Sequence, residues 1–113
     1  MSHPEYRSCI DACVRCAEAC EQCAAACLEE ADMIHLAGCA RLGRDGAEIC
    51  WLAAAFLGRG SQFAQEVCAA CAEVCAACGL ECEKYETGPC LRCAEACRRC
   101  AEECRRLTAP AVA

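Results

Sequence analysis

Sixteen of the eighteen cysteines in this chain fall into three runs, in which successive cysteines lie alternately three and four residues apart. Cysteine thiolates are soft ligands, and so many of them in so regular a pattern indicate binding of soft metal ions. The first run is Cys9, Cys13, Cys16, Cys20, Cys23 and Cys27; the second is Cys68, Cys71, Cys75, Cys78 and Cys82; the third is Cys90, Cys93, Cys97, Cys100 and Cys104. The other two, Cys39 and Cys50, lie between the first run and the second.

Steps of three and four residues place side chains on one stripe of an α-helix, the stripe that packs against partner helices. Here that stripe carries thiols where leucine, isoleucine or valine would be usual. Short connections between helices favour antiparallel neighbours. We therefore predict an all-α protein, an antiparallel up-down-up-down four-helix bundle with a cysteine-lined core, as a single domain over residues 1–113. The predicted helices cover about residues 4–30, 32–57, 62–84 and 89–107.

Two of the three breaks between these helices are marked by residues that end helices. The sequence Gly58-Arg59-Gly60-Ser61 separates the second helix from the third, and Thr87-Gly88-Pro89 separates the third from the fourth. Ser61 is suited to cap the third helix. The first break holds no glycine or proline and is inferred from phase. Cys27 and Cys39 are twelve residues apart, which would place them about 120° apart on one continuous helix.

The second helix carries only Cys39 and Cys50, eleven residues apart and about 20° apart around the axis. His35 precedes Cys39 by four residues, so we expect it to share the inner stripe. Gly43 and Gly46 lie on or near the same stripe. Glycine costs a helix about 1 kcal/mol relative to alanine, and a packing reason for these two would be room for the contents of the core.

Composition and charge exclude several classes of function. A formal net charge of −6 argues against nucleic-acid binding, which favours a basic surface. The longest uncharged apolar stretch, residues 49–58, is too short to span a bilayer. The first residues contain no apolar signal-peptide region, so we expect a cytoplasmic protein with reduced thiols. No nucleophile–base arrangement stands out, and we expect no enzyme.

Charge also bears on which metal such a core would hold. A thiol that loses a proton and gains a monovalent ion leaves the net charge unchanged, so one Cu(I) per cysteine keeps the core neutral. A Zn²⁺ ion held by four thiolates carries a net charge of −2, and several such sites in one narrow core are costly without cations nearby. No lysine or arginine falls within a cysteine stripe. The pattern therefore favours multiple Cu(I) ions per chain.

Three alternatives remain beside copper. A zinc or cadmium thiolate buffer would use the same ligands. A disulfide-stapled helical scaffold is compatible with the even number of cysteines, although a reducing compartment disfavours it. Iron–sulfur binding is the third alternative, but the sequence lacks the Cys-x₂-Cys-x₂-Cys-x₃-Cys-Pro run of bacterial ferredoxins.

Six segments join the three runs to the sparse second helix. They are Cys9-Ile-Asp-Ala-Cys13, Cys27-Leu-Glu-Glu, His35-Leu-Ala-Gly-Cys39-Ala-Arg-Leu, Glu48-Ile-Cys50, Cys68-Ala-Ala-Cys71-Ala-Glu-Val-Cys75-Ala-Ala-Cys78-Gly-Leu-Glu-Cys82 and Cys90-Leu-Arg-Cys93-Ala-Glu-Ala-Cys97. In these segments and their order the chain resembles the cytosolic branch of the bacterial copper storage proteins, over about residues 6–106. The resemblance implies storage of many Cu(I) ions by thiolates inside the bundle, with all eighteen cysteines as candidate ligands, and often a homotetramer.

The chain departs from the family pattern at two places. Relatives can carry a cysteine where this chain has Gly46, so the second helix contributes one ligand fewer. The loop before Cys90 can be rich in histidine in relatives, whereas residues 85–89 here contain none.

The predicted topology gathers soft donors at one end of the bundle, at Cys27, Met33, His35, Cys82 and Cys90. At the opposite end lie Phe56, Leu57 and Phe63, which could plug it. We therefore expect copper to be admitted at the first end, with His35 as an outer ligand and Met33 as a weaker candidate. A histidine at a helix end with its hydrogen bonds satisfied is the alternative for His35.

Overall fold

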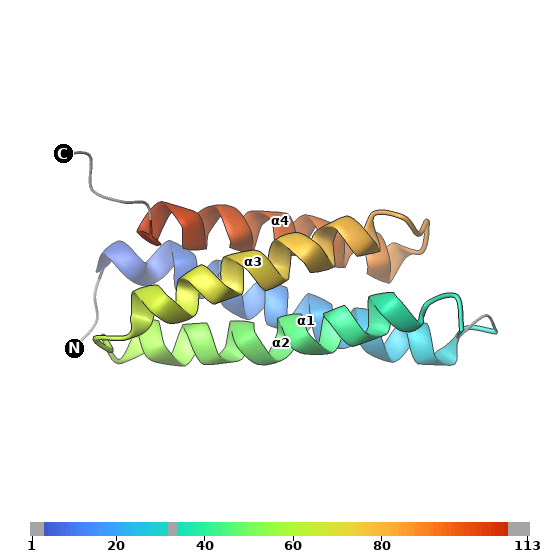
Figure 1. Ribbon diagram of the computed structural model, residues 1–113, viewed down its shortest axis with the longest axis horizontal. Coiled ribbons are helices and arrows are strands. Elements are labelled where there is room, and N and C mark those ends of the chain that lie inside the picture. The colour runs from blue at the N-terminus through green and yellow to red at the C-terminus, as the bar shows by residue number, and fades with distance from the viewer. Residues whose placement is uncertain (1–3, 32–33, 109–113) are drawn as a thin grey trace.

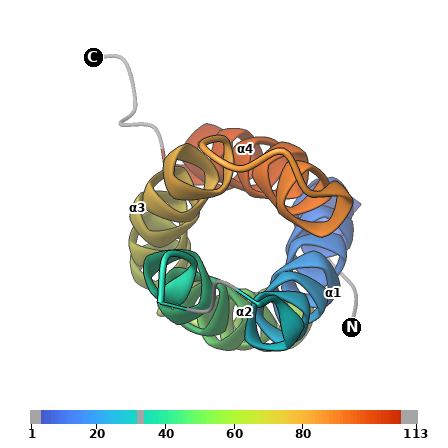
Figure 2. The same ribbon diagram turned by 90° about the vertical axis from the view of Figure 1, so that its right-hand side faces the viewer.

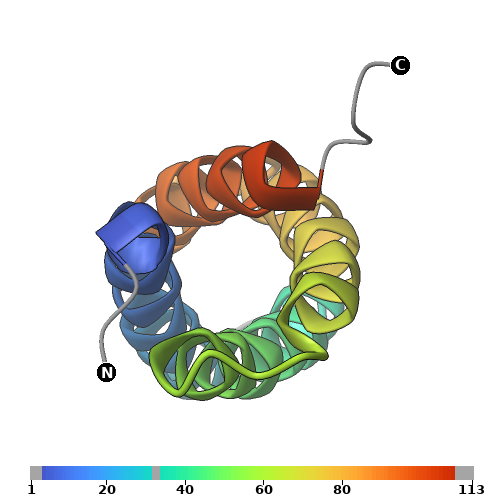
Figure 3. The same ribbon diagram turned by 90° about the vertical axis from the view of Figure 1, so that its left-hand side faces the viewer.

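Four antiparallel helices form a ring around a central core, as the end-on views in Figures 2 and 3 show. The structure is a computed structural model and describes residues 4–31 and 34–108. After a short 3₁₀ turn (Pro4–Tyr6) come α1 (Arg7–Glu29), α2 (Ala37–Gly58), α3 (Ala64–Cys82) and α4 (Gly88–Thr108) (Figure 1). Each helix packs against its two neighbours in the ring, α1 and α3 each against α2 and α4. The predicted all-α, up-down-up-down bundle is confirmed.

The turn between α2 and α3 lies where the sequence predicts. Gly60 adopts a left-handed conformation (φ 64°), and the backbone N–H of Ser61 donates to the Phe56 carbonyl (2.9 Å) in a Schellman-type helix end. The Ser61 hydroxyl accepts from the Phe63 backbone N–H (3.1 Å) within the turn, but the N-cap residue of α3 is Phe63, so Ser61 is not the cap that the sequence suggested. At the start of α4 the Thr87 hydroxyl accepts from the Cys90 backbone N–H (3.2 Å).

The second helix begins later than predicted. Its predicted start at Asp32 lies outside the described residues, a turn occupies residues 34–36, and the helix begins at Ala37. The α1 helix ends because Glu30 takes an extended conformation (φ −76°, ψ 148°). Leu36 is then buried at the end of the bundle. Leu36 is the residue directly before the helix, and the turn at residues 34–36 contains no glycine or proline that would mark it in the sequence.

The core consists almost entirely of cysteine and alanine. All eighteen cysteines are buried, none more than 2% exposed, and the large apolar side chains buried with them are Leu36 and Leu57. In the described part of the chain no charged or polar side chain is buried, and no helix is long and apolar enough to cross a membrane. The predicted cysteine-lined core is confirmed. Since a buried cysteine is a small apolar group, this core removes little hydrocarbon from water.

Glycine allows α2 to lie close to α1. A Cβ atom on Gly43 would come within 3.2 Å of the Cys20 carbonyl oxygen and 3.5 Å of the Ala24 Cβ. The Gly43→Val substitution would add three carbons at this contact. It should lower the free energy of unfolding of the reduced, metal-free protein by about 1–3 kcal/mol, the usual cost of overpacking. Urea unfolding followed by circular dichroism measures the change.

Gly58, at the end of the same helix, supplies the control, because a Cβ there would meet nothing within 4 Å. Gly58→Ala should raise the free energy of unfolding by about 0.5 kcal/mol through a less flexible unfolded chain. If Gly43→Val unfolds at the same urea concentration as Gly58→Ala, the close approach of α1 and α2 is wrong.

Candidate metal centre

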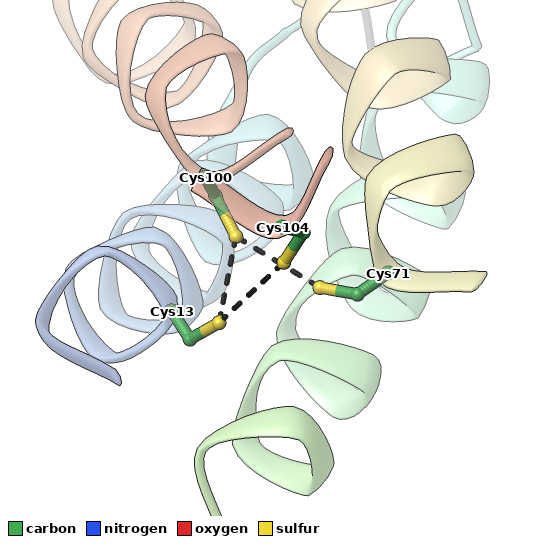
Figure 4. A group of neighbouring side chains, drawn as sticks. All are labelled: Cys13, Cys71, Cys100 and Cys104. Atoms are coloured by element: carbon green, nitrogen blue, oxygen red, sulfur yellow. Dashed lines mark hydrogen bonds between the residues drawn. The ribbon is translucent and has the colours of Figure 1, made fainter. Parts of the chain in front are cut away.

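The thiols of all four helices meet in the core of the bundle. They form clusters in which the sulfur atoms are close enough together to bind one metal ion. Within each cluster the sulfur atoms lie within 4.8 Å of one another. The clusters include Cys9/Cys68/Cys104, Cys13/Cys71/Cys100/Cys104, Cys16/Cys50/Cys75/Cys100, Cys20/Cys78/Cys93/Cys97 and Cys23/Cys27/Cys39/Cys90. Figure 4 shows the second of these, with one thiol from α1, one from α3 and two from α4 converging on one space.

These clusters join into a continuous column. Cys104 belongs to the first two clusters and Cys100 to the second and third. The third and fourth are linked by the Cys16–Cys97 sulfur contact at 3.6 Å. Cys82 connects the fourth to the last, because its sulfur lies 3.9 Å from that of Cys78 and 3.2 Å from that of Cys39. No break in the sulfur contacts separates one end of the bundle from the other.

The sulfur separations suit shared coordination of a small soft ion. With metal–sulfur bonds of about 2.3 Å, sulfurs that share one ion lie about 3.8–4.6 Å apart, depending on whether four, three or two of them bind it. The sulfur contacts across helices run from 3.2 Å (Cys39–Cys82) to 4.0 Å (Cys13–Cys104), at or a few tenths of an ångström below these separations without a metal. Small side-chain rotations are enough to complete two- or three-coordinate sites.

The column is an uncharged environment. Burial raises the pKa of the Cys27 thiol, and it raises the pKa of Cys90 to about 12. Thiols in such surroundings keep their protons at neutral pH until a metal displaces them. No buried lysine, arginine or histidine in the described part of the chain offers a balancing positive charge. A monovalent ion that replaces a proton therefore costs the core no net charge, whereas a divalent ion bound by four thiolates leaves two negative charges.

The cysteines are free thiols rather than disulfides. All eighteen are unpaired. The closest contact among those given above, between the sulfurs of Cys39 and Cys82, is 3.2 Å, whereas a disulfide bond is about 2.05 Å long. The scaffold stapled by disulfides is therefore not the arrangement in this structure.

Gly46 in α2 leaves room for a sulfur from α1. A Cβ atom at this position would lie 2.9 Å from the Cys20 sulfur and 3.8 Å from the Cys78 sulfur. Real Cβ atoms do not approach that closely, so a side chain here would displace Cys20 from its cluster. The placement of Gly46 near the inner stripe is confirmed, and the packing reason for it is the position of Cys20.

His35 does not share the inner stripe, contrary to the sequence expectation. It is exposed in the turn before α2, and its ring meets that of Tyr85 edge-on with 5.6 Å between centroids. The reason is the later helix start at Ala37, which takes residue 35 out of helical phase with Cys39. Met33, the other candidate outside the cysteines, lies outside the described residues.

Tyr85 closes the same end of the bundle and was not singled out by sequence reasoning. Its hydroxyl donates to Glu81 (2.8 Å) and lies 3.2 Å from the His35 carbonyl oxygen. The Glu81 carboxylate beside it raises the pKa of Tyr85 to about 12. This contact ties the loop after α3 to the turn before α2. Both lie at the end of the bundle that faces the viewer in Figure 2, the end of the Cys23/Cys27/Cys39/Cys90 cluster.

Apolar side chains lie at the opposite end of the bundle, where α2 turns into α3 (Figure 3). Leu57 is 1% exposed, and Phe56 is half-buried with the Arg59 guanidinium 4.5 Å from its ring centre. Phe63, expected to contribute to the plug, is 54% exposed. Of the three residues expected at this end, Leu57 and Phe56 pack with the core, and Phe63, directly before α3, does not.

Comparison with known proteins identifies close relatives. The family model for the copper storage proteins (Csp) matches residues 2–109. The chain is 48% identical over 89 residues to the uncharacterized cysteine-rich protein YhjQ of Bacillus subtilis strain 168, covering 79% of this chain and 82% of that protein.

Two solved structures are similar in sequence and in fold. The first is the Cu(I)-bound copper storage protein BsCsp3, with 47% identity, TM-score 0.89 and coverage of 93% of this chain and 99% of that one. The second is a cytosolic copper storage protein from Streptomyces lividans with five coppers, with 41% identity, TM-score 0.90 and coverage of 96% of both chains. The resemblance noted from the sequence is confirmed.

The free, buried thiols can be tested by counting them. Anaerobically prepared protein should give eighteen reactive thiols per chain in guanidinium chloride, because none is in a disulfide. In the folded protein the same reagent should react on the order of 100-fold more slowly, since it must await opening of the bundle. A thiol-specific chromogenic reagent measures both. A count well below eighteen in denaturant would mean that disulfides hold the bundle.

Proposed function

Because this chain belongs to the copper storage protein family, we propose that its thiol column stores many Cu(I) ions per chain. The observation that carries the proposal is the unbroken column of eighteen buried thiols with no buried charge among the described residues. All eighteen cysteines are proposed as ligands, in two- and three-coordinate sites that share sulfurs. The two solved relatives described above were both determined with copper bound.

Charge supports copper over the zinc or cadmium alternative. Each Cu(I) that binds displaces one proton, so a filled column remains as neutral as an empty one. A divalent ion and the four thiolates that bind it have a net charge of −2. The described core contains no cation to offset this charge. A few Zn²⁺ ions are compatible with this geometry, and a full column of them is not.

Burial supports storage over delivery or catalysis. A metal chaperone needs an exposed, exchangeable site, and every cysteine here is at most 2% exposed. The family is one of metal storage proteins, and we propose no catalytic residue. In this proposal the chain acts as one domain, in the cytoplasm where thiols stay reduced, and as a homotetramer as the family resemblance implies. Its partners are copper ions, with no nucleic acid and no membrane.

We propose that copper enters at the end of the bundle where α1 meets α2 and α3 meets α4. Cys27 and Cys90, the two cysteines with any exposure, both lie there, whereas Leu57 is buried at the other end. His35 is exposed at the same end and can offer an imidazole nitrogen to an incoming ion before the thiols take it. Exchange from sulfur to sulfur then carries ions inwards.

Capacity is the first quantity to measure. An anaerobic titration of the reduced protein with Cu(I) against a competing chelator should show tight uptake of well over ten ions per chain. About one proton should be released per ion, because neutral thiols become thiolates. The same titration with Zn(II) should stop at a few ions. Saturation at about four ions of either metal would indicate ordinary four-thiolate sites and support the zinc-type buffer.

The loading end can be tested with a pair of variants at opposite ends. His35→Ala should slow both Cu(I) loading and its removal by a chelator several-fold, because it deletes the proposed outer ligand. Phe63→Ala, at the other end, should leave both rates unchanged because Phe63 is 54% exposed and does not pack with the core. Stopped-flow detection of chelator absorbance gives the rates. Equal rates for His35→Ala and the unmodified protein would remove the outer-ligand role.

A further inference from the structure

A groove of about 320 Å³ runs between α1 and α2, beside the end where copper is proposed to enter. Its volume is at the lower end of the range for small-molecule sites, about 300–1,000 Å³. The helices that form it lie side by side in Figures 1 and 2. Its lining includes Cys27 and the exposed Leu28 from α1, and Ala37, Ala40, Arg41 and Arg44 from α2.

The groove places the most exposed cysteine of the chain beside two arginines that form no ion pair within the described part of the chain. Cys27 lines it and is the most exposed cysteine of the chain, at 2%. Arg41 and Arg44 line it as well, are both exposed, and form no ion pair with any described residue. A protein of net charge −6 thus places two unneutralised guanidinium groups next to the outermost thiol of its column. Guanidinium groups bind carboxylates through paired hydrogen bonds.

Two other grooves in the described part of the chain lack this combination. The groove between α3 and α4 reaches Cys75, but that cysteine is completely buried and Arg98 at its rim is paired with Glu83 at 2.5 Å. The groove between α1 and α4 carries Arg15 and Arg99 and has no cysteine in its lining.

We propose that the groove between α1 and α2 docks an anionic low-molecular-weight thiol that carries Cu(I), and that Cys27 receives the ion from it. The inference rests on the proposed function, because it supplies the donor for the column. Arg41 and Arg44 hold the carboxylates of the carrier, and the small side chains of Ala37 and Ala40 leave room for its backbone. The thiolate end, with its copper, then points at Cys27.

The transfer is a ligand exchange without change of oxidation state. In the carrier complex Cu(I) is held by two thiolates. The Cys27 sulfur forms a bond to copper while one carrier sulfur–copper bond breaks, and the proton of the Cys27 thiol passes to the departing thiolate, which leaves as a thiol. A second exchange of the same kind, with Cys23, Cys39 or Cys90, releases the other carrier molecule. These three sulfurs lie within 4.8 Å of the Cys27 sulfur.

The test compares two Cu(I) donors with the same thiolate chemistry and opposite outer charge. Glutathione carries carboxylates, and cysteamine carries an ammonium group. The variant R41Q/R44Q should slow initial loading from Cu(I)–glutathione on the order of tenfold at low salt, the scale of electrostatic guidance. It should not slow loading from Cu(I)–cysteamine. Added salt should reduce the difference between the unmodified protein and the variant.

Two control variants separate a docking site from an effect of overall charge. R15Q/R99Q removes the same charge at the groove that lacks a cysteine and should load from either donor at nearly the unmodified rate. R41K/R44K keeps the charge and should retain most of the rate with glutathione. Equal slowing by R41Q/R44Q and R15Q/R99Q would show an effect of overall charge and overturn the docking site, as would equal slowing with both donors or no slowing at all.

Final capacity separates this inference from the proposed function. The unmodified protein and all three variants should reach the same copper content per chain from cysteamine, since none of the four arginines is a ligand. If the unmodified protein itself takes up only about four ions, the storage function fails whatever the rates show. If capacity is high and R41Q/R44Q loads normally from glutathione, storage stands and the docking site is wrong.

Discussion

The fold depends on whether a core of thiols can be buried without charge. A protonated cysteine is a small apolar group that packs acceptably in an interior, and a thiolate in the same place would carry an unbalanced charge. The described core contains no charged side chain that could offset one. Protons and monovalent metal ions are therefore interchangeable occupants of the column. Metal bonds between helices also replace the hydrocarbon contacts that such a core lacks, so binding contributes to the stability of the fold.

The second helix gives the bundle its asymmetry. Three helices supply the cysteine runs, while α2 supplies Cys39 and Cys50 and two glycines that face α1. Gly43 brings the backbones together, and Gly46 gives the Cys20 sulfur a place that any side chain would fill. A helix with few ligands thus determines where the ligands of its neighbour lie, and its sparseness in cysteine is part of how the column is packed.

The sequence predicted the features that follow from periodicity and from strong turn signals. Alternating steps of three and four residues predicted three of the helices and the inward face of sixteen cysteines, and Gly60 with Ser61 predicted the second turn. The start of α2 could not be predicted, because the turn before it contains no glycine or proline and the burial of Leu36 there depends on tertiary packing. The prediction that His35 shares the inner stripe was wrong for the same reason. The contacts of Tyr85, and the groove between α1 and α2 that Cys27 and Arg41 both line, depend on tertiary packing and have no local sequence pattern.

The column has shared sulfurs along its length, the apolar side chains of Leu57 and Phe56 at one end, and thiols near the surface only at the other end. With copper entry and exit at that end alone, as proposed above, the ions are loaded and withdrawn in last-in, first-out order. The ions taken up most recently are the first to be withdrawn, and those deepest in the bundle are withdrawn only after the others. The same protein then holds two classes of metal distinguished by depth alone, a readily exchanged fraction near the entry end and a long-term reserve beneath it.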